Sequence, residues 1–167
     1  CAAAYHGFGM SLFDAVCHAM TTIATGGFAN YDSSFAAFDP GVEYVAALFL
    51  LLASLPFVRN VQLAAGSAQP LFKDSQARVF LLIAVGAVAA LALWRALGAE
   101  GPFEPILRKS LFNGPSILTG AGFASADYNA WGSLPVAVFF VIGMVGGCAG
   151  STCCAIKVFR FQVLFAA

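Results

Sequence analysis

The sequence predicts an all-α integral membrane protein built from parallel, pseudo-symmetric repeats. Three observations lead to this fold class: an apolar composition, long runs without charge, and a pattern that recurs after 95 residues. Of the 167 residues, 60% are hydrophobic and 10% are charged, whereas about 25% of the residues in a soluble domain are charged. This composition excludes a soluble domain and a disordered chain, and the net charge of zero disfavours nucleic acid as a partner.

The first and fourth elements are short amphipathic helices that each lead into a glycine cluster. Residues 11–24 precede Thr25-Gly26-Gly27, and residues 105–118 precede Thr119-Gly120-Ala121-Gly122. Both segments are shorter than the roughly 20 residues that a transmembrane helix needs. We therefore expect re-entrant helices, whose irregular ends are tolerated where protein or a water-filled cavity covers them.

The second and third elements are apolar runs, and a basic residue closes each of them. The run over residues 44–58 contains Pro56, which we expect to kink or end the helix because proline lacks an amide hydrogen. Residues 79–94 are uncharged between two arginines, whose long side chains can extend to the membrane surface. The sequence predicts a transmembrane helix from about residue 75 to 98.

The fifth element is an uncharged run over residues 128–156, which is long enough to span a membrane. Gly143, Gly146, Gly147 and Gly150 lie in its second half, and each glycine costs a helix up to about 1 kcal/mol relative to alanine. Two alternatives follow. Either the helix is broken, or the pairs Gly143/Gly147 and Gly146/Gly150 are GxxxG motifs for close helix packing.

A shift of 95 residues superimposes the two glycine clusters. The matched positions are Gly27-Phe28-Ala29 with Gly122-Phe123-Ala124, Asp32 with Asp127, and Pro40 with Pro135. One unit contains two full spans, so successive copies have the same orientation around an axis normal to the membrane. The first copy lacks an opening helix and the chain ends within an apolar run, so we expect the parent protein to contain further repeats.

The charged residues divide between the two sides of this topology. The side of the glycine turns carries seven acidic and three basic residues, a net charge of −4: Asp14, Asp32, Asp39, Glu43, Glu100, Glu104, Asp127, Arg95, Arg108 and Lys109. The other side carries a net charge of +4: Arg59, Lys73, Arg78, Lys157, Arg160 and Asp74. Excess lysine and arginine mark the cytoplasmic side, so we expect the turns to open outward behind an acidic entrance that attracts cations.

A short helix that ends in a glycine turn at membrane depth suits a cation. The helix C-terminus carries a partial negative charge, and glycine allows successive carbonyl groups to point the same way and replace an ion's water shell. The main-chain oxygens that we expect to bind the ion are those of Ala24, Thr25, Gly26, Gly27, Thr119, Gly120, Ala121 and Gly122. Phe28 and Phe123 are expected to pack behind the turns. The alternative is an ordinary extracellular loop with glycines.

The segments TIATGGFANYD and ILTGAGFASADY resemble the filter loops of the Trk/Ktr/HKT superfamily of potassium transporters. GMVGGCAGSTCCAIKVFRF is similar to that family's third-repeat inner helix, and SLPFVRNVQL to its second-repeat counterpart. The resemblance covers nearly the whole chain. It implies a potassium-channel-like fold, in which four repeats of outer helix (M1), re-entrant pore helix with filter loop, and inner helix (M2) surround one ion path, and Gly27 and Gly122 are the key filter glycines.

The resemblance also implies a gate. In the family the third-repeat inner helix is broken into a loop that blocks the path below the filter. The matching residues are Gly146, Gly147, Gly150, Ser151, Thr152 and the following Lys157. Cys153-Cys154-Ala155 stands where the family often has more glycine, which bears on the flexibility of the gate.

The resemblance divides the chain into three parts. Residues 1–66 form the pore helix, filter loop and inner helix of one repeat, residues 67–74 a cytoplasmic linker, and residues 75–167 the next repeat. We expect potassium uptake across the inner (plasma) membrane by a multi-pass protein that is not an enzyme and has no cofactor, with potassium as its transported ligand. The family further implies a homodimer and a cytosolic nucleotide-binding regulatory subunit.

Several alternatives stay open at this stage. A sodium or mixed monovalent cation transporter of the same fold is one, because a first-repeat residue influences that choice in the family. An alternating-access carrier is another, although it predicts inverted repeats. Cys17 and His18 with Cys148, Cys153 and Cys154 match no familiar zinc spacing, so His18 is expected to serve packing or a polar contact.

The charged residues near the expected outer entrance allow two interpretations. Asp14, Asp32 and Asp127 form an outer ring that attracts cations, or Asp32 and Asp127 brace the filter loops. Arg108 and Lys109 oppose cation attraction, and they are expected to pair with Glu100 or Glu104.

Overall fold

The computed structural model describes residues 1–98 and 102–166, and in these ranges the chain is helical without strands. The bounds are α1 Ala2–Gly7, α2 Leu12–Ile23, η1 Ser34–Ala37, α3 Pro40–Ala53, α4 Phe57–Ala64, α5 Gln69–Lys73, α6 Ser75–Gly98, α7 Phe103–Leu118, η2 Tyr128–Trp131, α8 Ser133–Val145 and α9 Val158–Ala166. Here η denotes a short 3-10 helix. Glu100, which the sequence analysis assigns to the acidic entrance, lies outside the described residues.

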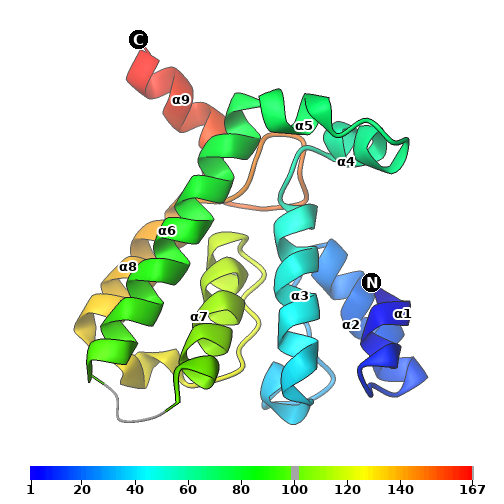
Figure 1. The fold of residues 1–167 in the computed structure, drawn as a ribbon, viewed down its shortest axis with the longest axis vertical. Coiled ribbons are helices and arrows are strands. Elements are labelled where there is room, and N and C mark those ends of the chain that lie inside the picture. Colours follow the sequence, from blue (N-terminus) through cyan, green and yellow to red (C-terminus); the bar gives the residue numbers. More distant parts are fainter. Residues whose placement is uncertain (99–101, 167) are drawn as a thin grey trace.

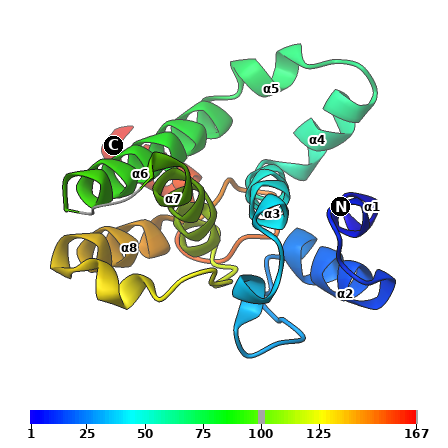
Figure 2. The same ribbon diagram turned by 60° about the horizontal axis from the view of Figure 1, so that its bottom comes forward.

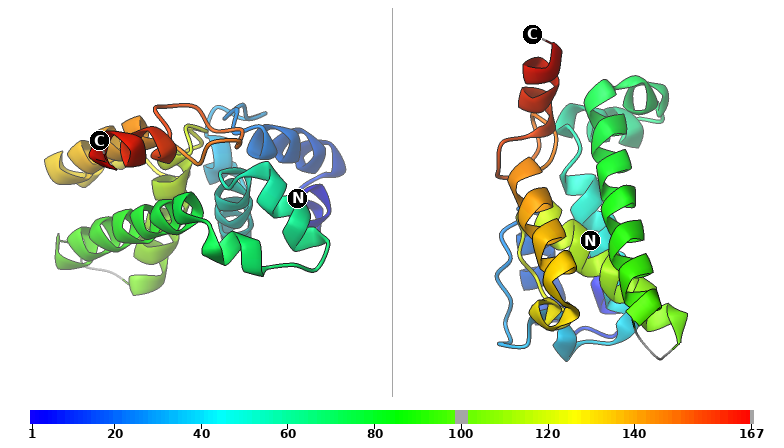
Figure 3. Two further views of the ribbon diagram at one scale, coloured as in Figure 1. Left: turned by 90° about the horizontal axis from the view of Figure 1, so that it is seen from above. Right: turned by 90° about the vertical axis from the view of Figure 1, so that its left-hand side faces the viewer.

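Helix α6 confirms the predicted transmembrane helix and its bounds. Its 24 residues correspond to about 36 Å, which is enough to cross a hydrocarbon layer of about 30 Å. Among the described residues it is the one helix that is long and apolar enough to do so alone. It packs against α7 and α8, and Figure 3 shows α6 and α8 side by side.

The predicted break at Pro56 is confirmed. Helix α3 ends at Ala53, α4 begins at Phe57, and the two helix axes differ in direction by 111°. Pro56 is the N-cap residue of α4, where its missing amide hydrogen costs no helical hydrogen bond. The chain therefore turns sideways after α3, at the end of the molecule where Figure 1 places α4 and α5.

The apolar run over residues 128–156 is not one span. It contains η2, the 13-residue helix α8, and a loop that begins at Gly146. Gly146 has φ of +74°, a left-handed conformation that ends the helix after Val145. The GxxxG interpretation is therefore wrong, because neither Gly143/Gly147 nor Gly146/Gly150 lies within a single helix.

The repeat inferred from the sequence is visible in the order of elements. Helix α2, η1 and α3 correspond to α7, η2 and α8, and α3 and α8 run in the same direction (Figure 1). Helix α3 of the first copy packs against α7 of the second. The connection between α7 and α8 lies beside the connection between α2 and α3, as Figure 2 shows (Phe35 N to Ala124 O, 3.0 Å). The copies are parallel, as predicted.

The linker between the two copies is held by Asp74. Its carboxylate pairs with Arg59 Nε at 3.0 Å and accepts hydrogen bonds from the backbone amides of Gln76 and Ala77 at the start of α6. Burial by itself raises the pKa of Asp74, but these hydrogen bonds outweigh it, so the pKa lies below its ordinary value. Asp74 thus ties α4 to the beginning of the spanning helix.

Candidate functional site: two filter strands and a loop beneath them

The helices that precede the glycine clusters are α2 and α7, close to the predicted ranges. Ser11 is the N-cap residue of α2, and its hydroxyl accepts a hydrogen bond from the backbone amide of Asp14 at 3.1 Å. The two helices end at Ile23 and Leu118, directly before the glycine clusters. The partial negative charge of each helix C-terminus is therefore directed at the following strand.

Two short non-helical segments follow these helices, residues 24–27 and residues 119–122, and we call them the first and second candidate filter strands, although neither is a β-strand. They share one backbone pattern. Thr25 and Gly27 have φ of +49° and +72°, and the residues 95 positions later, Gly120 and Gly122, have φ of +77° and +80°. Alternating left-handed and ordinary residues allow successive carbonyl groups to turn toward one side. Thr25 is β-branched, and such residues rarely adopt positive φ, so the surrounding structure must stabilise this conformation.

Matching hydroxyl groups fasten each strand to its own helix. Thr21 Oγ1 donates to the carbonyl oxygen of Phe28 at 2.9 Å, and Ser116 Oγ donates to that of Phe123 at 2.7 Å. Thr21 and Ser116 are 95 residues apart, as are Phe28 and Phe123. The sequence analysis missed this pair, although the same shift that aligned the glycines also aligns these hydroxyl residues.

The two strands approach each other closely. A Cβ atom on Gly27 would lie 1.8 Å from the carbonyl oxygen of Ala121, so only glycine fits there. The structure thus brings the two predicted sets of filter residues together at the ends of α2 and α7. The side chains of Thr25, Thr119 and Ala121 are buried.

The prediction for the two phenylalanines is half correct. Phe123 is fully buried, and its ring centroid lies 4.7 Å from that of Phe35 in the other repeat. Phe28 is 78% exposed, so it does not pack behind its turn. The reason is that the neighbouring repeat covers Phe123, and no such cover lies over Phe28 within the described residues.

The loop between α8 and α9 passes across the two candidate filter strands on the side of α4, α5 and α9, which we call the side beneath the strands (Figure 1). Gly146, Gly150, Ala155 and Lys157 all have positive φ. The amide of Cys148 donates to the carbonyl oxygen of Ser54 at 2.9 Å, which attaches the loop to the end of α3. This loop contains the six residues predicted for the gate, and the helix break expected there is present.

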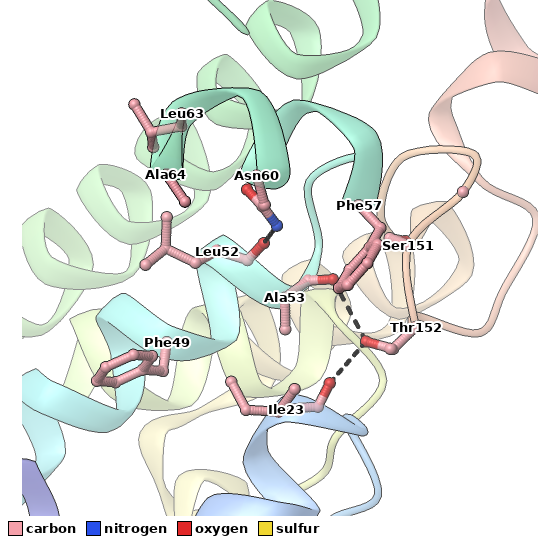
Figure 4. A pocket seen from close by; sticks show the side chains of 11 residues that line it. Ile23, Phe49, Leu52, Ala53, Phe57, Asn60, Leu63, Ala64, Ser151 and Thr152 are labelled. Carbon is pink, nitrogen blue, oxygen red and sulfur yellow. Dashed lines mark hydrogen bonds between the residues drawn. The ribbon is translucent and has the colours of Figure 1, made fainter. Parts of the chain in front are cut away.

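Thr152 is the point where the loop meets the first of the two candidate filter strands. Its Oγ1 lies 3.0 Å from the carbonyl oxygen of Ile23 and 3.3 Å from that of Ala53, as the dashed lines in Figure 4 show. The hydroxyl of Thr25 in turn donates to the carbonyl oxygen of Thr152 at 3.1 Å. These contacts join the loop to the end of α2, the end of α3 and the first candidate filter strand.

Further hydrogen bonds fix the part of the loop that faces α4. The amide of Phe57 donates to the carbonyl oxygen of Gly150 at 2.9 Å, and Lys157 Nζ donates to that of Ser151 at 3.3 Å. A cavity of about 500 Å³ lies between this part of the loop, α3 and α4, with Phe49 and Phe57 on its wall (Figure 4).

The cysteine and histidine residues do not gather into a metal site in the part of the chain that the structure describes. His18 is fully buried, and its ring lies edge-on to Phe35 and Phe38, with centroids 5.4 and 5.0 Å away. Its Nδ1 lies 2.8 Å from the carbonyl oxygen of Asp14. The packing role that the sequence analysis expected for His18 is therefore confirmed.

The acidic residues near the predicted entrance serve different purposes. Asp14 is buried and accepts a hydrogen bond from Asn30 Nδ2 at 2.8 Å, so it braces the loop after the first strand. Asp127 caps η2 through the amide of Asn129 at 3.1 Å. Asp32 is exposed. Bracing and capping therefore account for Asp14 and Asp127 without an ion.

Arg108 has the partner that the sequence analysis expected and a second one that it missed. Its Nε donates to Glu104 Oε1 at 2.9 Å, and its Nη1 forms an ion pair with the buried Glu43. The other expected partner, Glu100, lies outside the described residues. The sequence analysis places Glu43 only on the acidic side, because its partner Arg108 lies 65 residues away along the chain.

The comparisons with known proteins agree on one family. The family model for TrkH, described as a cation transport protein, matches residues 2–167. The chain is 43% identical to the Trk system potassium uptake protein TrkI of Halomonas elongata, over 97% of this chain and 33% of that protein. It is 36% identical to the Trk system potassium uptake protein TrkG of Escherichia coli K12, over 99% of this chain and 34% of that protein.

A solved structure shows the same fold. The crystal structure of the potassium transporter TrkH from Vibrio parahaemolyticus superimposes with a TM-score of 0.92 at 31% identity. The match covers 99% of this chain and 36% of that one. The chain thus spans about a third of the length of the relatives that it matches.

Proposed function

The chain belongs to the TrkH family of cation transport proteins, and we propose that it forms two neighbouring repeats of a potassium uptake protein. Residues 1–66 and 75–167 are the two repeats, and residues 67–74 are the cytoplasmic linker between them. The named relatives are potassium uptake proteins, which supports potassium as the transported ion.

One observation carries this proposal. Two strands 95 residues apart repeat the same alternation of φ and the same hydroxyl-to-carbonyl bond, and they meet side by side. Such strands present rows of carbonyl oxygens, which can replace the water shell of a monovalent cation. Carbonyl oxygens of Ala24 to Gly27 and of Thr119 to Gly122 would form two sides of a four-sided filter.

The loop from Gly146 to Lys157 is proposed to gate this path. Thr152 lies against the end of the first filter strand and bonds to two helix ends, so the loop obstructs the exit while these bonds are intact. Glycines at positive φ give the loop the backbone freedom to rearrange.

The setting of the filter is also part of the proposal. The basic end with α4, α5 and α9 would face the cytoplasm, in the inner (plasma) membrane. The family resemblance supports a homodimer and a cytosolic nucleotide-binding regulatory subunit that acts on the gate. The two repeats offer two filter strands of four, so the remaining repeats of the parent chain are required for conduction.

The proposal is tested by ion flux. The complete parent protein in liposomes, with its regulatory subunit supplied and its folding verified, is expected to take up rubidium or potassium in preference to sodium. Equal sodium uptake would favour the mixed-cation alternative, and absence of any monovalent cation flux would contradict the proposal.

Cys154 offers a test of where the path runs. Its sulfur atom is exposed and lies 4.0 Å from the carbonyl oxygen of Gly120, directly below the second filter strand. Since exposed thiols are the ones that react, a positively charged methanethiosulfonate reagent applied from the cytoplasmic side is expected to abolish most of the rubidium flux. Cys148 and Cys153 are buried and are not expected to react.

Two variants serve as controls for this reagent. Cys154→Ala is expected to conduct and to be insensitive, whereas Cys17→Ala is expected to remain sensitive. Continued block of Cys154→Ala would mean that Cys154 does not line the path.

A further inference from the structure

A buried carboxylate links the two repeats behind the filter. Glu43, near the start of α3, is 4% exposed, and Arg108 of α7 is 8% exposed. Arg108 donates to Oε1 of Glu43 and, through Nε, to Glu104. The second oxygen of Glu43 accepts a hydrogen bond from Ser125 Oγ at 3.1 Å. One carboxylate therefore contacts both the second pore helix and the loop that follows its filter strand.

Ser125 connects this carboxylate to the filter. It lies three residues beyond Gly122, and its side chain is buried. Its amide donates to Asn113 Oδ1 at 3.2 Å, and Asn113 Nδ2 donates to Ser125 Oγ at 3.1 Å. The carboxylate of Glu43, the amide of Asn113 and the hydroxyl of Ser125 all have partners, which fixes the outer end of the strand relative to both α7 and α3.

The first repeat braces its loop differently. Asn30 occupies the position equivalent to Ser125, and it bonds to Asp14 on the pore helix of its own repeat. The positions equivalent to Arg108 and Glu43 are Phe13 and Val138, which are apolar. The ion pair is therefore not a feature of every repeat, and within this chain it marks the contact between these two.

Stability alone does not explain such a pair. The cost of removing two charges from water offsets most of their attraction, so a buried ion pair often stabilises a protein no more than apolar residues of similar size. A better attested role of buried polar groups is to select one register among several packings. Here the register is the position of the second strand along the first, which places Ala121 next to Gly27.

We propose that Glu43 is a positioning residue that sets the second filter strand against the first through Ser125, and that cation selectivity depends on it. This inference rests on the proposed function, and it concerns the spacing of the strands rather than contact with the ion. Because a carbonyl filter selects by the placement of its oxygens, a shift of one strand admits sodium before it abolishes conduction.

The test compares rubidium and sodium uptake by the complete parent protein in liposomes. Ser125→Ala removes the contact with Glu43 and the hydrogen bond from Asn113 Nδ2, and it leaves the ion pair in place. We expect normal folded yield and a fall of about tenfold in the ratio of rubidium to sodium uptake, the effect of one hydrogen bond to a charged group. Ser110→Ala is the matched control, because among the described residues the hydroxyl of this buried serine bonds only to the carbonyl oxygen of Ile106 in its own helix.

A second pair of variants decides the matter if Ser125→Ala does not fold. Glu43→Gln keeps an oxygen that can accept from Ser125 and is expected to retain most of the ratio, whereas Glu43→Ala is expected to lose it. An unchanged ratio in Ser125→Ala, or equal ratios in Glu43→Gln and Glu43→Ala, would overturn the proposal. Absence of rubidium uptake by the unsubstituted protein would instead contradict the proposed function.

Discussion

Gly27→Ser is expected to lower rubidium flux by at least about tenfold and to reduce its preference over sodium, since a left-handed backbone costs a residue with a side chain about 1–2 kcal/mol. The backbone conformation is only part of the effect. The new Cβ atom would lie 1.8 Å from the carbonyl oxygen of Ala121, so the second strand must move as well. Flux of both ions in liposomes, measured with the complete parent protein, checks this expectation.

Substitutions at two further glycines separate the effect of the backbone conformation from that of the contact between the strands. Gly122 has φ of +80° but open space around its Cβ position, so Gly122→Ser is expected to have a smaller effect that arises from the backbone alone. Gly86 lies within α6, outside both glycine turns, is not left-handed and has open space around its Cβ position, so Gly86→Ser is the matched control. If Gly27→Ser conducts as well as Gly86→Ser, the glycines are turn residues and the filter assignment is wrong.

Thr152→Val is expected to raise rubidium flux severalfold when the regulatory subunit is absent. Valine has nearly the same shape as threonine, but it cannot donate to the carbonyl oxygens of Ile23 and Ala53. Each hydrogen bond of this kind contributes about 1 kcal/mol, so its loss shifts the loop toward an open arrangement. Rubidium uptake in liposomes that contain only the transport protein measures the effect.

The neighbouring Ser151 supplies the control. Its hydroxyl donates to Cys148 within the same loop, so Ser151→Ala leaves the attachments to α2 and α3 in place and is expected to keep the flux low. Unchanged flux in Thr152→Val, or equal increases in both variants, would show that the Thr152 contacts do not hold the path closed.

The local pattern of the sequence was sufficient for the elements and for their repetition. The uncharged run between Arg78 and Arg95 predicted α6 with its correct bounds, and Pro56 predicted the break between α3 and α4. The 95-residue shift located both glycine turns. Each of these signals acts over a few residues, through the hydropathy of a turn of helix, the missing amide of proline or the backbone freedom of glycine.

Other features required the packing of distant segments. The sequence predicted burial for Phe28 and Phe123 alike, but only Phe123 has a neighbouring repeat against it. The sequence also left open whether the glycines from Gly143 onward break the helix or allow another helix to pack closely. The positive φ of Gly146 shows that the helix is broken. The sequence did not reveal what Thr152 bonds to, because these partners lie 99 and 129 residues away.

The sequence by itself therefore determined the membrane class, the parallel repeats and the positions of the two glycine turns, because hydropathy and glycine spacing are local properties. Only the tertiary structure decided how the strands stand against each other. That register depends on Gly27 at Ala121, on Thr152 beneath the first strand and on Glu43 behind the second. Each of these contacts joins segments far apart in the chain, and its geometry exists only once α3 packs against α7.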